Sequence, residues 1–210
     1  MISLEHANLL LEKASLTERI RWAEQTFGDG LVLTTSFGTY SAVMLHVVAT
    51  MLPGAAVISI DTGHNDQTRA FAAALAERLG IQVHRYTIPP PPPSEVAPLE
   101  SHEEYLQRHK VDLMEAALKR HGATAWMSGV QRNETDHRRE FNFLMRRADG
   151  LYKFHPLLDW DARRLFHYCK EHALPINDAY VDPAKGANQK QECGIHLTGL
   201  ANQSFTSSEL

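Results

Sequence analysis

The sequence contains little cysteine, with two such residues among 210, Cys169 and Cys193. Two thiolates are too few for an iron–sulfur cluster, which four cysteines normally hold. The two residues could pair in principle, but we expect a cytoplasmic protein, and thiols in that compartment remain reduced. The sequence therefore predicts two free cysteines and no bound cluster.

Long apolar runs are also missing, and so is a large excess of charge of one sign. No uninterrupted apolar stretch approaches the roughly 20 residues that span a bilayer, and the first residues lack a signal-peptide profile. We therefore expect no membrane association and a cytoplasmic location. A formal net charge of −4 gives no support for nucleic-acid binding. An anionic ligand would have to be met by local basic groups.

The chain does contain a regular alternation of strand and helix signals. Apolar runs at 31–35, 56–60, 81–88 and 125–130 predict strands, and helical patterns follow the first three, ending near residues 49, 79 and 122. This β–α–β order predicts an α/β fold with a doubly wound, mostly parallel sheet and helices on both faces. Residues 151–156 are predicted as an edge strand, because Pro156 has no N–H to donate.

The composition divides the chain into three parts. We expect residues 1–30 to form an N-terminal helical cover, 31–180 an α/β domain, and 181–210 a flexible tail that carries Cys193. The prolines at 89–93 predict a stiff connector.

Smaller features complete this prediction. Asp159 is expected to cap a helix whose packed face includes Cys169, whereas Arg146 and Arg147 have the pattern of ordinary surface charge. Residues 94–109 are too polar and too poorly periodic to predict a helix.

Polar groups follow three of the predicted strands. The loop Ser36–Ser41 precedes a helix, an arrangement in which backbone N–H groups and the helix dipole hold a phosphate; a plain turn is the alternative. Asp61 could meet a ribose or adenine group, or cap a turn. Arg132 and Arg138 could grip phosphate or sulfate as planar donors, or belong to a solvated loop.

Cys193 lies beside a glycine and among polar residues, in the sequence Glu192-Cys193-Gly194-Ile195-His196. A thiol in such surroundings is a candidate nucleophile, but the reactive form is the thiolate. Lys190 and a protonated His196 would favour the thiolate, whereas Glu192 would oppose it. Taken alone, the peptide is equally consistent with an incidental exposed cysteine.

Together these residues resemble the phosphoadenosine phosphosulfate (PAPS) reductase family, part of the adenine nucleotide α-hydrolase-like group. The motifs occur in the expected order: the loop 36–43, Asp61-Thr62-Gly63, the strand 126–129 with Arg132 and Arg138, Pro156-x-x-Asp159-Trp160, and residues 192–196. The last element is the most specific of the five.

The resemblance implies a function and a set of site residues. It implies thioredoxin-dependent reduction of PAPS to sulfite and adenosine 3′,5′-bisphosphate through an S-sulfocysteine at Cys193, with His196 as the second catalytic residue. Thioredoxin or glutaredoxin would be the reductant, and no bound cofactor or metal is implied. A homodimer is also implied. The expected substrate-binding residues are Ser36, Phe37, Gly38, Thr39, Ser41, Asp61, Thr62, Gly63, Lys110, Gly129, Arg132 and Arg138.

The chain departs from the family pattern in three places. After Asp61-Thr62-Gly63, residues His64-Asn65-Asp66 replace the usual aromatic residues, and the stretch is one residue short. Gln131 stands where the family usually has an arginine, and the segment between Tyr180 and Gln191 is shorter than usual. These differences leave open a nucleotide-binding relative without turnover. An ATP pyrophosphatase-type adenylating enzyme is a weaker alternative, because Phe37 and Tyr40 replace the glycine and aspartate expected there.

Overall fold

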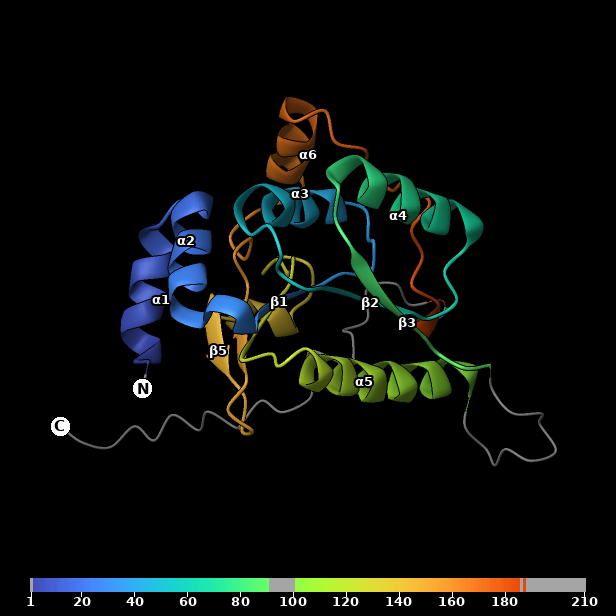
Figure 1. The fold of residues 1–210 in the computed structure, drawn as a ribbon, viewed down its shortest axis with the longest axis horizontal. Coiled ribbons are helices and arrows are strands. Elements are labelled where there is room, and N and C mark those ends of the chain that lie inside the picture. Colours follow the sequence, from blue (N-terminus) through green and yellow to red (C-terminus); the bar gives the residue numbers. More distant parts are fainter. Residues whose placement is uncertain (1, 91–100, 186, 188–210) are drawn as a thin grey trace.

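The computed structural model describes residues 2–90, 101–185 and 187, and a single six-stranded sheet runs through it (Figure 1). The strand order is β3-β2-β1-β4-β6-β5, and all neighbours are parallel except β5 and β6. The strands are β1 Leu31–Thr34, β2 Val57–Asp61, β3 Val83–Thr87, β4 Ala125–Met127, β5 Leu144–Arg146 and β6 Tyr152–Phe154. The predicted mostly parallel sheet is confirmed.

Helices cover both faces of this sheet (Figure 1), as the doubly wound prediction requires. Helices α3 (Ser41–Met51), α4 (Asp66–Leu79) and α6 (Ala162–Glu171) lie on one face, and α5 (His102–Arg120) lies on the other. Helices α1 (Leu4–Lys13) and α2 (Leu16–Phe27) pack beside the β5 end, and the short helices are η1 Gly28–Gly30, η2 His137–Glu140 and η3 Pro183–Lys185. No helix in the described ranges combines the length and apolar character that a bilayer crossing needs.

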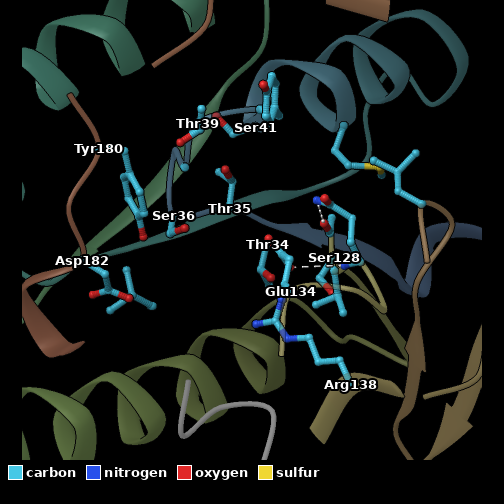
Figure 2. A pocket seen from close by; sticks show the side chains of 18 of the residues that line it. Thr34, Thr35, Ser36, Thr39, Ser41, Ser128, Glu134, Arg138, Tyr180 and Asp182 are labelled. Carbon is cyan, nitrogen blue, oxygen red and sulfur yellow. Dashed lines mark hydrogen bonds and ion pairs between the residues drawn. The ribbon is translucent and has the colours of Figure 1, made fainter. Parts of the chain in front are cut away.

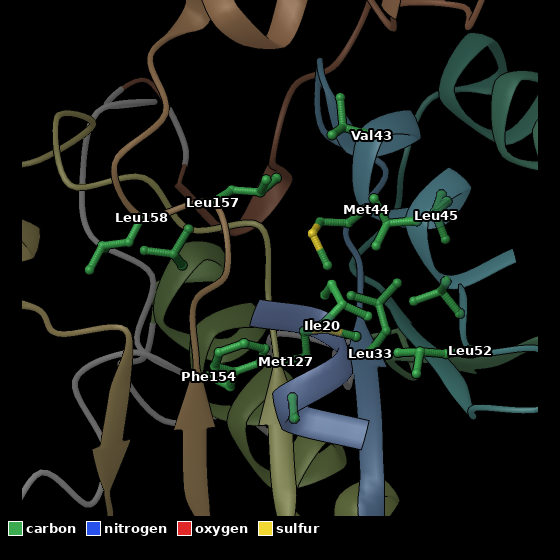
Figure 3. Close-up of a cluster of buried hydrophobic side chains, with 14 of the residues drawn as sticks. Ile20, Leu33, Val43, Met44, Leu45, Leu52, Met127, Phe154, Leu157 and Leu158 are labelled. Carbon is green, nitrogen blue, oxygen red and sulfur yellow. The ribbon is translucent and has the colours of Figure 1, made fainter. Parts of the chain in front are cut away.

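Side chains of β1 alternate between two apolar cores, as the pleat of a strand requires. Leu31 and Leu33 belong to the core under α3, whereas Val32 belongs to the core under α5. Figure 3 shows the first core, where Leu33, Met44 and Phe154 from a strand, a helix and a second strand lie together. Burial of both faces fixes the register of β1 and therefore the position of the loop that follows it.

Helix α1 covers the outer edge of the sheet at β5. The side-chain amide of Asn8 donates to the carbonyl of Leu144 over 2.9 Å, and the Leu144 N–H donates back to Asn8 Oδ1 over 2.8 Å. One side chain thus satisfies both backbone groups that Leu144 presents on that side.

Two predicted features near residue 155 are wrong. Strand β6 is not an edge strand, because it lies between β4 and β5. The three-residue strand β5, which the pattern did not predict, takes the edge instead. The cap of α6 is Asp161, which accepts from the Arg164 N–H, whereas Asp159 binds Arg19.

Two further predictions, the start of α5 and the exposure of Arg147, are also wrong. Helix α5 begins at His102, inside the segment judged too polar for a helix, because Ser101 and Glu104 form a capping box there. Arg147 is not surface charge: its side chain is 8% exposed and pairs with Glu115 and Asp149.

Candidate active site

A cavity of about 450 Å³ lies at the carboxyl ends of β1 and β4. The chain leaves β1 toward β2 and one edge of the sheet, and it leaves β4 toward β5, β6 and the other edge. Open α/β sheets bind ligands in the crevice at such a switch point. Figure 2 shows Thr39 and Ser41 on one side of the cavity, Glu134 and Arg138 on another, and Tyr180 and Asp182 on a third.

The first wall is the predicted phosphate loop after β1. Ser36, Gly38, Thr39 and Ser41 all line the cavity. The Ser41 hydroxyl is buried and makes no hydrogen bond within the described residues. Because Ser41 also begins the eleven-residue helix α3, a polar side chain and a helix N-terminus face the same space.

Phe37 has a different role from its neighbours in the loop. Its side chain is 1% exposed and packs in the core, and it is not among the residues lining the cavity. Its backbone has φ of 55°, a left-handed conformation that is unusual for a residue with a bulky side chain. The Asn177 side chain donates to the Phe37 carbonyl over 2.8 Å. Phe37 therefore anchors the loop to the core under α3.

The second wall follows β4. Gly129, Gln131, Glu134 and Arg138 line the cavity, and the Arg138 guanidinium donates to the Glu134 carboxylate. Arg132 is directed elsewhere: it donates to the Phe141 carbonyl over 3.2 Å and is not a lining residue. The structure thus brings one of the two predicted arginines to the cavity.

Asp61, Thr62 and Gly63 at the end of β2 are not among the cavity-lining residues. Asp61 Oδ1 accepts the backbone N–H groups of Gly63 and His64, each over 2.9 Å. Burial alone would raise the pKa of Asp61, but these hydrogen bonds, together with the charges of His64 and Arg69, hold the pKa below its ordinary value. This geometry matches the turn-capping alternative for Asp61.

The third wall comes from α5 and from residues near Asp182. Lys110 Nζ lies 2.7 Å from Asp182 Oδ2, and both side chains are 5% exposed or less. Burial would raise the pKa of Asp182, but the Lys110 charge and hydrogen bond outweigh it and lower the pKa. With Arg138, Lys185 and Glu134, the lining holds three cations and two carboxylates, so it has a small positive excess.

A buried polar pair borders the cavity at the end of β4. Ser128 lines the cavity, and its hydroxyl lies 3.0 Å from His155 Nδ1. Burial, together with the charges of Lys153 and Arg138, lowers the pKa of His155 to about 3. His155 is therefore neutral at physiological pH.

Sequence reasoning missed several lining residues. Those next to a recognised motif could have been found from it; those after residue 177 carried no signal, because they follow an irregular segment. The missed residues include Thr34, Thr35, Tyr40, Met44, Ser128, Glu134, Tyr180, Asp182 and Lys185.

Cys193 and His196 lie outside the described residues, as do most of the prolines at 89–93. Cys169 is buried on α6, as predicted, and burial raises the pKa of its thiol. Within the described ranges, no group of three or more His, Cys, Asp or Glu side chains could hold a metal ion.

The chain matches known proteins over most of its length. The family model "phosphoadenosine phosphosulfate reductase domain" matches residues 30–182. The PAPS reductase of a Synechococcus species is 37% identical, with 93% of this chain and 97% of that protein covered. The PAPS reductase of Thiocapsa roseopersicina is 36% identical, with 92% and 93% covered.

One solved structure agrees with this family match, and a second agrees with the fold alone. The PAPS reductase of Candida auris, solved as a phosphate complex, superposes with a TM-score of 0.67 at 25% identity, covering 85% of this chain and 91% of that one. The NMN synthetase of Francisella tularensis, with a TM-score of 0.56 at 15% identity, shares the fold. The matched family model spans well over half of the chain and the relatives exceed 30% identity, so this chain belongs to the PAPS reductase family.

Proposed function

We propose that the protein reduces 3′-phosphoadenylyl sulfate to sulfite and adenosine 3′,5′-bisphosphate. The observation that carries this proposal is the cavity at the β1/β4 switch point, lined by the loop 36–41 and Arg138 in a chain of the PAPS reductase family. A cavity of this size suits one small-molecule ligand.

The cavity supplies what a polyanionic nucleotide requires. Phosphate oxygens would accept from the N-terminus of α3 and from the Ser41 hydroxyl, while Arg138 would meet a second anionic group. Arg138 is held by Glu134, whose side chain is 43% exposed. This carboxylate can turn toward water when an anion takes its place.

The chemistry requires a nucleophile at the sulfonyl sulfur, and Cys193 is our candidate. Its thiolate attacks the sulfur, the S–O bond breaks, and adenosine 3′,5′-bisphosphate leaves with the electron pair. A protonated His196 would favour the thiolate. A thiolate of thioredoxin or glutaredoxin then attacks the Cys193 sulfur and expels sulfite, and its second thiol resolves the mixed disulfide.

Replacement of the candidate nucleophile tests this proposal. Wild-type protein incubated with ³⁵S-labelled PAPS and no reductant should retain one equivalent of label, which thioredoxin or dithiothreitol releases as sulfite. Cys193→Ser should bind adenosine 3′,5′-bisphosphate in a calorimetric titration but acquire no label, because the hydroxyl stays protonated at neutral pH. Cys169→Ser is the matched control and should label like wild type.

A nucleotide-binding relative without turnover is the second candidate. The alignment with the Synechococcus protein extends over 233 positions, more than the 210 residues of this chain, so the relative contains residues that this chain lacks. Wild-type protein that binds the nucleotide but never acquires label would overturn the reductase proposal in favour of this one.

A further inference from the structure

Ser128 and His155 follow two neighbouring parallel strands, β4 and β6, at their carboxyl ends. The Ser128 N–H donates to the Phe154 carbonyl over 3.1 Å, and the His155 N–H donates to the Phe143 carbonyl over 2.8 Å. Each bond continues the pairing of the sheet one residue beyond the strand. The sheet therefore holds both backbones, and the two side chains meet at a fixed place.

The serine of this pair lines the cavity, and the histidine does not. Ser128 is 5% exposed and is a lining residue, whereas His155 is 1% exposed and lies behind it. Figure 2 shows Ser128 on the side of the cavity that also carries Glu134 and Arg138. His155 can thus influence a bound ligand through the Ser128 hydroxyl.

The imidazole ring of His155 is held as firmly as its backbone. The Phe141 ring stacks on it, with 5.5 Å between ring centres and 21° between ring planes. Its Nδ1 lies 3.0 Å from the Ser128 hydroxyl oxygen. Because burial and the charges of Lys153 and Arg138 lower the pKa of His155 to about 3, the neutral ring carries one hydrogen, on Nδ1 or on Nε2.

The position of that hydrogen decides what Ser128 offers to a ligand. A hydroxyl has one hydrogen to donate and two lone pairs that accept. If Nδ1 accepts the serine hydrogen, the oxygen turns only lone pairs toward the cavity and repels an anion. If Nδ1–H donates, the serine hydrogen remains available to a ligand oxygen. Lys110, Arg138 and Lys185 line the same cavity, so the expected ligand is an anion, and the second arrangement suits it.

We infer that His155 is a positioning residue: it donates Nδ1–H to Ser128, and Ser128 donates its own hydrogen to an anionic oxygen of the ligand beside Arg138. Ser128 is then a residue that selects a charged ligand over an uncharged one. The inference rests on the proposed function, because it takes the ligand to be a polyanionic nucleotide.

A double-mutant cycle on ligand affinity tests the contact and the role of His155 together. Ser128→Ala removes the hydroxyl, His155→Leu removes its partner, and His155→Asn keeps an N–H donor near the position of Nδ1. Ser59→Ala is the matched control, because Ser59 is a strand serine, 1% exposed, that does not line the cavity. For each variant we would measure affinity for adenosine 3′,5′-bisphosphate by calorimetry and for adenosine by displacement.

Ser128→Ala should bind the bisphosphate about tenfold more weakly, because a hydrogen bond to a charged acceptor is lost, and it should bind adenosine as wild type does. In His155→Leu the serine hydroxyl can occupy three staggered rotamers, so the affinity should fall by about threefold. The same substitution should lower affinity no further once Ser128 is alanine. His155→Asn should keep most of the affinity, and Ser59→Ala should match wild type.

The position of the His155 hydrogen can be measured directly. In protein labelled with ¹⁵N-histidine, long-range ¹H–¹⁵N spectra distinguish the protonated ring nitrogen from the other one. The signals of His155 are those that are missing in His155→Asn. A hydrogen on Nδ1 is expected in the bisphosphate complex, and a ring protonated on Nε2 would overturn the inference.

The affinities can overturn it as well. Equal losses for the bisphosphate and for adenosine in Ser128→Ala would assign the hydroxyl to an uncharged group of the ligand, and unchanged affinity would assign it to none. A full effect of His155→Leu in the alanine background would leave the histidine a structural role alone.

Failure of the proposed function would give a different result. Wild-type protein that binds the bisphosphate but never acquires label at Cys193 would refute the reductase proposal, and the affinities of the variants would still decide the role of Ser128. Wild-type protein that does not bind the bisphosphate would refute both.

Discussion

Two basic–acidic pairs join distant parts of this chain, and they differ in what surrounds them. Arg19 reaches Asp159 with two hydrogen bonds of 2.6 and 3.0 Å, and its remaining donors contact the carbonyls of Leu11 and Pro156. Lys110 Nζ lies 2.7 Å from Asp182 Oδ2, and both residues line the cavity. The arginine makes four hydrogen bonds to protein groups, whereas the lysine lies beside space for a ligand.

This difference indicates that similar pairs serve different ends. Through Pro156 and Asp159, Arg19 connects the N-terminal helices to the loop after β6. The Arg19 guanidinium also lies 4.0 Å from the centre of the Phe143 ring, just before β5. The loop after β6 includes Leu157, which lines the cavity. We expect loss of the Arg19 pair to lower mainly the stability of the fold, whereas the Lys110 pair lines the cavity.

The largest expected effect is on Arg19→Met, which would show whether the first pair is mainly structural. Breaking a buried pair costs 3–5 kcal/mol, and because Asp159 is 35% exposed we expect the lower end, about 3 kcal/mol. The melting temperature should fall by about 6–12 °C, with nucleotide affinity unchanged at low temperature.

Arg164→Met is the matched control for that measurement. Arg164 lies 4.0 Å from the same carboxylate but is 54% exposed, so the free energy of unfolding should fall by less than about 1 kcal/mol. Equal losses in the two variants, measured by urea unfolding, would contradict the assigned role of Arg19.

The pH dependence of stability should separate His155 from both pairs. The folded pKa of about 3 lies below the unfolded value, so unfolding takes up a proton below pH 6.5 and stability is lost as the pH falls. At pH 5 the loss should be about 2 kcal/mol. His155→Gln should remove this slope in urea titrations at several pH values.

The carboxylate of Asp159 affects stability in a lower pH range than His155. Arg19 lowers the pKa of Asp159 despite its burial, so that pair stabilises the fold above the unfolded carboxyl pKa of about 3.9 and loses its contribution as the pH falls through the folded value. Arg19→Met should therefore retain the wild-type slope between pH 5 and 6.5. If the pH slope of stability disappears in Arg19→Met, the titrating group is not His155.

The smallest effect is expected at a third pair, where Arg147 binds both Glu115 and Asp149. Glu115 makes two hydrogen bonds of 2.5 and 2.9 Å, and Asp149 makes one of 2.8 Å from a side chain that is 53% exposed. Asp149→Asn should lower the free energy of unfolding by about 1 kcal/mol or less. A loss as large as that of Arg19→Met would show that exposure does not rank these pairs.

The parallel sheet could be predicted from sequence because its central strands are buried on both faces. Val57 to Ile60 leaves little choice but a buried strand, and Gly80 ends α4 with φ of 65°, as expected of a glycine there. Strand β5 could not be predicted, because three residues give no period and the partner strand follows only five residues later.

Some residues of the site could likewise be predicted from the sequence, and others could not. The loop 36–41 and Gly129 follow strands directly, so their position at the cavity could be inferred from the order of elements. The partner of Lys110 could not, because Asp182 lies 72 residues away in an irregular segment. Arg132 and Arg138 are alike in sequence, but Arg132 contacts the Phe141 carbonyl and the Phe143 ring, whereas Arg138 pairs with Glu134.

The contact between Asn8 and Leu144 has a consequence for behaviour in concentrated solution. An edge strand with unpaired N–H and C=O groups is a template for pairing with another molecule, and natural proteins cover or interrupt such edges. The Asn8 side chain occupies both backbone groups of Leu144, the first residue of β5. Helix α1 therefore protects this edge of the sheet from pairing with another molecule. The protection depends on the side-chain amide of Asn8.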